Sequence, residues 1–80
     1  MKAKVYVTLK NGVLDPQGKA IEQSISNLGF DGISNVKQGK FIELDINETD
    51  QKKATEKVNK ICENLLANTV IENFKYELVA

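Results

Sequence analysis

The sequence predicts one α+β domain over residues 1–80, in which two helices pack on one face of an antiparallel sheet. Segments whose apolar residues recur at every second position, typical of strands, are interspersed with segments whose apolar residues recur every three to four positions, typical of helices. The order of these segments is strand, helix, strand, strand, helix, strand. This is the β-α-β-β-α-β arrangement of a ferredoxin-like sandwich.

The first strand is expected from Met1 to Lys10, and Asn11 with Gly12 ends it. One face of this strand is apolar and the other is polar, which is typical of a sheet with one buried face. The residues expected to point into the core are Ala3, Val5, Val7 and Leu9.

Asp15 and Pro16 predict the start of the first helix. An aspartate carboxylate accepts the free N–H groups of a first helical turn, and proline suits the first helical position because its φ is already helical. We expect the helix to end at Gly29, which tolerates a left-handed backbone, with Phe30 folding back on Ile25. The apolar residues of this helix form a narrow stripe that we expect to lie on the sheet: Ala20, Ile21, Ile25 and Leu28.

The segment 33–46 has strand character on both sides of Gln38 and Gly39. A tight turn at these two residues would make a hairpin of 33–37 with 40–46. The other interpretation is a single bent strand over the whole segment. Both stay open at the level of the sequence.

Residues 47–50 are typical of a helix N-terminus, and the helix that follows is expected to end near Asn68. A last strand is expected from Val70 to Val79, where apolar and charged residues alternate. The apolar stripe predicted for the second helix consists of Ala54, Val58, Ile61, Cys62 and Leu65.

The face of the sheet that the helices do not cover must be polar or must meet a partner. The alternation places Tyr6 and Phe41 on that face, among charged side chains. Two aromatic residues there favour a surface that self-associates or binds a partner. The alternative is that both are isolated exposed rings, which are common on protein surfaces.

The composition argues against several function classes. Eleven lysines and no arginine balance 11 acidic residues, whereas nucleic-acid-binding proteins are usually basic and use arginine. No stretch approaches the ~20 apolar residues of a membrane span and the N-terminus lacks a signal-peptide core, so we expect a cytoplasmic protein without membrane or nucleic-acid partners. With no histidine and one cysteine, the chain has no ordinary set of metal ligands.

Groups suited to catalysis are also scarce. A nucleophile needs a neighbouring base, and Cys62 lies on the predicted apolar stripe, where we expect it to pack. The carboxylate pairs Glu43 with Asp45 and Glu72 with Glu77 lack apolar surroundings that would raise a pKa. We therefore expect no catalytic residue, no cofactor and no metal in this chain.

Gly18 is unexpected in the first turn of a helix, because glycine there costs about 1 kcal/mol relative to alanine. One hypothesis is that another chain approaches this turn so closely that any Cβ would collide. Leu14, Asp15, Pro16 and Gln17 would then form the rest of that contact. The alternative is that Gly18 makes room for a loop of the same chain.

Five short motifs are informative as a set: GVLDPQGKA (12–20), LGF (28–30), GKFIEL (39–44), CENLLAN (62–68) and VIE (70–72). In this order and spacing they resemble the PurS family, the small subunit of phosphoribosylformylglycinamidine (FGAM) synthase. The resemblance covers most of the chain.

The resemblance implies a non-catalytic assembly subunit in the fourth step of de novo purine biosynthesis. It implies a homodimer or higher homo-oligomer that binds a large synthetase subunit and a glutaminase subunit and supports transfer of ammonia between them. ATP and Mg would be used by the synthetase subunit and not bound by this chain. The residues that we expect to contact partners are Tyr6, Leu14, Asp15, Pro16, Gln17, Gly18, Phe41 and Asn68.

One position departs from the family pattern, because Thr69 stands where a proline commonly follows LLAN. This change affects the rigidity of the entry to the last strand more than the function. Asn68 still supplies a residue that tolerates the left-handed conformation in which many helices end.

The fold class also permits a second hypothesis from a different function class. A small dimeric domain of ferredoxin-like topology can bind a ligand at its dimer interface and act in regulation. This ligand-binding regulatory domain is the alternative to the assembly subunit.

Overall fold

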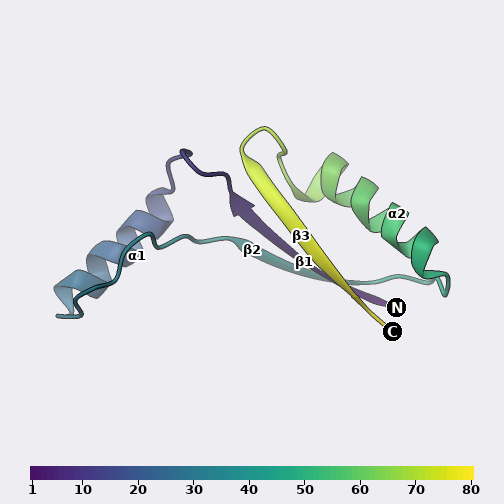
Figure 1. Ribbon diagram of the computed structural model, residues 1–80, viewed down its shortest axis with the longest axis horizontal. Coiled ribbons are helices and arrows are strands. Elements are labelled where there is room, and N and C mark those ends of the chain that lie inside the picture. Colours follow the sequence, from purple (N-terminus) through teal and green to yellow (C-terminus); the bar gives the residue numbers. More distant parts are fainter.

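The computed structural model describes residues 1–80 and divides the chain into a body and an arm (Figure 1). The body is a three-stranded antiparallel sheet in the order β2-β1-β3, with helix α2 on one face. The arm, residues 11–38, holds helix α1 and the segment that returns from it. The elements in chain order are β1 (Lys2–Leu9), α1 (Pro16–Asn27), β2 (Lys40–Asp45), α2 (Gln51–Ile61), the π-helical turn η1 (Cys62–Leu66) and β3 (Glu72–Val79).

Strand β1 is the centre of the sheet and of the hydrophobic core. It pairs antiparallel with both neighbours, and its residues Ala3, Val5 and Val7 are buried as their alternation predicts. The same alternation holds on the two edge strands. The half-buried residues of those strands that pack against the core are Ile42, Leu44, Phe74, Tyr76 and Leu78.

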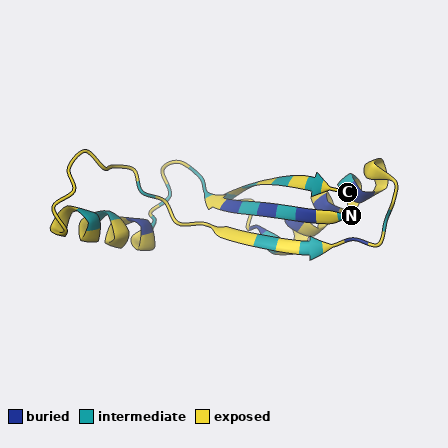
Figure 2. Cartoon of the chain, turned by 90° about the horizontal axis from the view of Figure 1, so that it is seen from below, coloured by how far each residue is buried: buried dark blue, intermediate teal, exposed yellow.

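The two ends of the chain lie side by side at the end of the sheet opposite the arm (Figures 1 and 2). Lys2 pairs with Val79. The N-terminal ammonium of Met1 donates to the carbonyl of Ile46 at 3.1 Å, and the N–H of Ile46 donates back to Met1 at 2.7 Å. These contacts close the body at that end.

Helix α2 covers the inner face of the sheet. Asp50 is its N-cap, and Oδ1 of Asp50 accepts from the N–H of Lys52 at 2.9 Å. Three residues of the predicted stripe, Ala54, Val58 and Cys62, are fully buried and form one core cluster with the inward residues of β1. The predicted stripe is therefore confirmed at these three residues, whereas Ile61, at the end of α2, is 36% exposed.

The C-terminal end of α2 differs from the prediction. The segment Cys62–Leu66 forms a turn of π-helix, after which the N–H of Ala67 donates to the carbonyl of Cys62 at 3.0 Å. A π turn adds a residue to the helical repeat, so it rotates the side chains that follow. Leu65 is 79% exposed as a result, and Leu66 packs against the core in its place.

No strand forms over residues 33–37, so the sheet has three strands and not the four expected. Both interpretations of the segment 33–46 are wrong, because β2 begins only at Lys40. Gly39 lacks the positive φ typical of a tight hairpin turn. The N–H groups of Val36 and Gln38 donate to carboxylates of the arm and are therefore not available to a neighbouring strand.

Helix α1 lies past the end of the sheet, so only α2 lies over the sheet in the single chain (Figures 1 and 2). No residue of α1 belongs to the core cluster. The radius of gyration is 16.0 Å, whereas a compact chain of this length would have about 12 Å. The α+β class with two helices and an antiparallel sheet is confirmed, but the arm makes the molecule elongated.

The predicted C-terminal end of α1 is confirmed. Gly29 has a left-handed backbone with φ of 92°. Its N–H donates to Ser26 at 3.0 Å, and the N–H of Phe30 donates to the carbonyl of Ile25 at 3.3 Å. This pair of bonds is the pattern in which glycine commonly ends a helix.

Val58→Ala should lower the free energy of unfolding by about 2 to 3 kcal/mol, because it removes two buried methyl groups and leaves a cavity beside β1. Leu65→Ala is the matched control and should change it by less than about 0.5 kcal/mol, because that side chain is exposed. Urea unfolding measures both. Equal losses in the two variants would contradict the rotation caused by η1.

Candidate functional site

One carboxylate binds both sides of the arm where the arm joins the body. Oδ1 of Asp15 accepts from the N–H of Gly18 at 2.8 Å, in the first turn of α1, and Oδ2 accepts from the N–H of Gln38 at 2.9 Å, just before β2. These donors favour the ionised form and hold the pKa of the Asp15 carboxyl below its usual value. Asp15 is thus the predicted N-cap and also the link between the start and the end of the arm.

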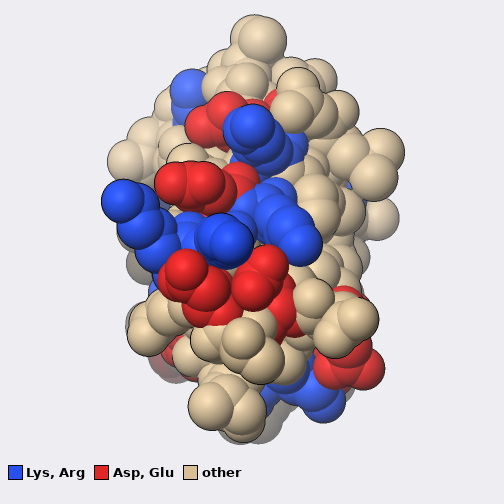
Figure 3. Space-filling model, turned by 90° about the vertical axis from the view of Figure 1, so that its right-hand side faces the viewer, with Lys and Arg blue, Asp and Glu red and all other residues tan.

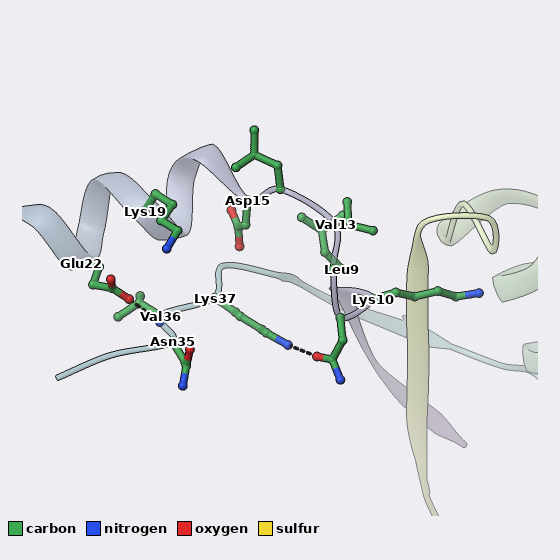
Figure 4. Close-up of a pocket in the computed structure, with 12 residues that line it drawn as sticks. Leu9, Lys10, Val13, Asp15, Lys19, Glu22, Asn35, Val36 and Lys37 are labelled. Atoms are coloured by element: carbon green, nitrogen blue, oxygen red, sulfur yellow. Dashed lines mark hydrogen bonds between the residues drawn. The ribbon is translucent and has the colours of Figure 1, made fainter.

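A second carboxylate fastens the returning segment further along α1. Oε1 of Glu22 accepts from the N–H of Val36 at 3.1 Å (Figure 4). The returning segment therefore runs beside α1, with N–H groups bound by side chains of the helix. The arm keeps its shape through polar contacts, whereas the body keeps its shape through apolar ones.

This packing accounts for Gly18. The residue is buried in the arm, and a Cβ at this position would lie closer than 3.0 Å to the carbonyl oxygen of Val36. The close approach comes from a loop of the same chain, as the second of the two hypotheses has it. A neighbouring chain is not needed to explain this glycine, so that reason for expecting a partner at Gly18 is wrong.

A hollow of about 550 Å³ lies where the arm meets the body (Figure 4). Two lysines reach the hollow from opposite sides. Lys19 points from α1 towards the returning segment. Lys37, on the returning segment, donates to Oδ1 of Asn11 at 2.7 Å. Lys10 points away from the other labelled side chains. We call this the root hollow, and its lining is formed by residues 9–15, Lys19, Glu22 and residues 35–37.

The predicted contact residues 15–17 also line a second hollow, of about 390 Å³, together with Lys40 and Glu72. Glu72 connects this hollow to Asn68, because Oε1 of Glu72 accepts from the N–H of Asn68 at 2.7 Å. Oε2 of Glu72 lies 3.9 Å from Nζ of Lys40. Tertiary structure thus brings predicted residues from two distant parts of the chain to one region.

Asn68 ends its helix in a different way from the one expected. The structure has no left-handed backbone at this residue. Instead, Oδ1 of Asn68 accepts from the N–H of Val70 at 3.2 Å, and the carbonyl of Asn68 accepts from Ile71 and Glu72. The side chain and the backbone of Asn68 therefore order the turn into β3.

Tyr6 and Phe41 lie together on the uncovered face of the sheet, as their alternation predicts. Their ring centroids are 5.1 Å apart, and Nζ of Lys75 lies 5.3 Å from the centroid of the Tyr6 ring. Phe41 remains 53% exposed. The rings form a contact pair and are not isolated, so an exposed aromatic patch exists on this face.

The groups that could carry chemistry are placed for packing or for surface pairing. Cys62 is buried, and burial, assisted by the charge of Glu63, raises the pKa of its thiol. The protonated thiol packs beside Val58 in the core cluster. On the face shown in Figure 3, lysine and acidic side chains are mixed and no patch of a single sign forms.

Neither helix combines the length and the apolar character that crossing a bilayer requires.

Residues 2–80 match the PurS family, described as phosphoribosylformylglycinamidine (FGAM) synthase. The chain belongs to the PurS family. The PurS subunit of phosphoribosylformylglycinamidine synthase from Synechocystis sp. is 46% identical to it over 77 residues, which are 96% of this chain and 77% of that protein.

Solved PurS structures share the fold. The Bacillus subtilis PurS structure gives a TM-score of 0.85 at 43% identity and covers 99% of this chain and 98% of its own. A chain in the structure of PurLQS from Thermotoga maritima gives 0.87 at 32% identity, over 98% and 95%. Scores this high over nearly the whole length indicate that the arm and the body are arranged similarly in these PurS chains.

Sequence reasoning on this PurS chain missed Lys19, Glu22, Asn35 and Lys37. Polar residues on the outer face of a predicted helix are normally solvated, so the helical pattern gave no reason to single out Lys19 or Glu22. The available signal was Gly18, which marked a close approach but not the segment that makes it. Gly39 carries a similar signal, because a Cβ there would lie closer than 3.0 Å to the carbonyl oxygen of Val7.

Gly18→Ala should destabilise the arm by about 1 to 3 kcal/mol through overpacking against Val36, although alanine is the better helix former. Hydrogen exchange at the amides of Val36 and Gln38 would report the loosening directly. Ser24→Ala, on the exposed side of α1, is the matched control and should leave this protection unchanged. A Gly18→Ala protein with equal or greater protection would refute the explanation.

Proposed function

We propose that this chain is the small subunit of FGAM synthase and acts as a non-catalytic assembly subunit. In this proposal it binds the synthetase and the glutaminase subunits and supports the transfer of ammonia between them, in the cytoplasm. ATP and Mg are used on the synthetase subunit. The observation that carries the proposal is the match to the PurS family over residues 2–80, supported by the likeness to a chain of PurLQS from Thermotoga maritima.

The surface of the chain supports a role in binding other proteins. Large apolar side chains are exposed in both the arm and the body, and apolar surface of this kind is more often found at interfaces than on free monomers. The most exposed of these side chains are Leu14, Leu28, Phe30, Ile33, Phe41, Leu65 and Val70.

The arm supports association of two copies. The stripe predicted for α1 is only partly covered in the single chain, because Ile25 is half-buried whereas Ile21 is 40% exposed and Leu28 is 75% exposed. Burial of these side chains against an identical chain would add hydrophobic stabilisation that the single chain lacks. We therefore include in the proposal a two-fold homodimer in which each α1 stripe is covered by the other copy.

Omission of this chain should abolish glutamine-dependent synthesis and spare much of the ammonia-dependent synthesis. Free ammonia can reach the synthetase from solution. Ammonia released from glutamine, in contrast, has to pass from the glutaminase to the synthetase, and this transfer requires the two subunits to be held together. The measurement combines purified synthetase and glutaminase with and without this chain and follows product formation from each nitrogen source. Equal rates from glutamine with and without the chain would refute the assembly role.

Ile25→Asp should convert the homodimer to monomer, because it places a charge in the centre of the α1 stripe. Light scattering coupled to size exclusion measures the mass. Gln23→Asp, on the opposite side of the helix, is the matched control and should keep the mass of the unchanged protein. A dimer that survives Ile25→Asp would locate the self-association elsewhere.

A further inference from the structure

Strand β3 is an edge of the sheet that nothing covers in the single chain. The order β2-β1-β3 leaves one long side of β3 unpaired, and in Figure 1 this strand lies in front of β1. Natural edge strands are commonly short, bulged or interrupted by proline, because an unpaired edge binds other strands. β3 has eight residues, no proline and an unbroken register with β1, so its edge is suited to pairing.

The ladder with β1 shows which residues of β3 turn their backbone groups to the free edge. In an antiparallel pair, residues that exchange hydrogen bonds alternate with residues that do not. The N–H of Lys10 donates to the carbonyl of Ile71 at 2.8 Å, so the bonds to β1 fall at every second residue from Ile71. The N–H and C=O groups of Phe74, Tyr76 and Leu78 therefore point to the free edge. No backbone bond outside the ladder reaches residues 73–79.

A second copy of β3 matches this edge on both faces of the sheet. A two-fold axis at Tyr76 would place this residue opposite its own copy and Phe74 opposite Leu78. These apolar side chains are half-buried and pack on the core in the single chain, and the pairing would extend the core across the interface. On the outer face, Lys75 of each copy would lie opposite Glu77 of the other, which is a favourable cross-strand pair.

The charges select this register among its neighbours. An axis at Lys75 would place the two copies of that lysine opposite each other, and an axis at Glu77 would do the same with two carboxylates. Like charges directly opposite each other destabilise a strand pair. The other edge strand, β2, lacks such a match, because an axis at its central Glu43 would again oppose two carboxylates.

We infer that β3 is a self-association surface, at which two copies pair their β3 strands antiparallel about a two-fold axis at Tyr76 and join their sheets into one. The occupant is a second copy because the sequence of β3 is complementary to itself when reversed. This surface lies in the body and is separate from the α1 stripe. A strip one strand wide is a small interface, so we expect it to be weaker than the association through α1 and to join homodimers as the concentration rises.

The test follows the mass by light scattering over a range of protein concentrations. The mass of the unchanged chain should rise above that of the homodimer. Lys75→Glu and Glu77→Lys, each alone, place like charges opposite each other and should move this rise to about tenfold higher concentration or more. The double variant Lys75→Glu with Glu77→Lys restores opposite charges and should associate again. Lys53→Glu, on the exposed side of α2, makes the same change in net charge as Lys75→Glu and should have no effect.

Hydrogen exchange gives a second readout with a control inside the same strand. The amide N–H groups of Phe74, Tyr76 and Leu78 should become protected as the concentration rises, because they gain partners only in the pair. Those of Lys75 and Glu77 are bound to β1 and should be protected at every concentration.

Several outcomes would overturn the inference. These are a mass that stays constant, a rise without protection of the edge amides, and a double variant that fails to associate. Protection that appears only when the synthetase or the glutaminase is added would assign the edge to that subunit instead. None of these outcomes decides the assembly role, which the comparison of nitrogen sources tests separately.

Discussion

The arm of this protein depends on the Asp15 carboxylate, which bonds to the first turn of α1 and to the end of the returning segment. Asp15 and Gln38 lie 23 residues apart in sequence, and no apolar core holds the two ends of the arm together. An isolated helix of 12 residues is marginal in water, so α1 needs contacts from outside itself. Asp15, with Glu22 and the close packing at Gly18, supplies them from within the arm.

The body is stabilised by apolar contacts and the arm by polar ones, and this difference suits an assembly subunit. The core cluster is small, with eight buried residues, and it lies wholly in the body. A short chain buries a limited fraction of its surface, and here that burial is concentrated on β1 and α2. The arm is left as an element with a defined shape and an exposed apolar stripe, which is what a docking element needs in order to bind without a large ordering cost.

The candidate site could be predicted in part from the sequence. The stretch Leu14 to Gly18 was identified as a unit because a strong helix start and an unfavourable glycine occur together. The placement of Tyr6 and Phe41 on one face followed from strand alternation, and the register of β1 with β2 brings them opposite each other. The lysines of the root hollow could not be found in this way, because their position depends on where the returning segment lies against α1.

The sequence by itself determined the local features: the N-caps of both helices, the inward and outward faces of β1 and the α+β class. Each of these features depends on residues that are close together in the chain, so the amino-acid sequence is enough to predict it. Only the tertiary structure decided that residues 33–37 leave the sheet, that η1 turns Leu65 outward and that α1 lies past the sheet. Residues 33–37 leave the sheet because carboxylates distant in sequence accept the N–H groups of Val36 and Gln38, and local periodicity carries no information about that choice.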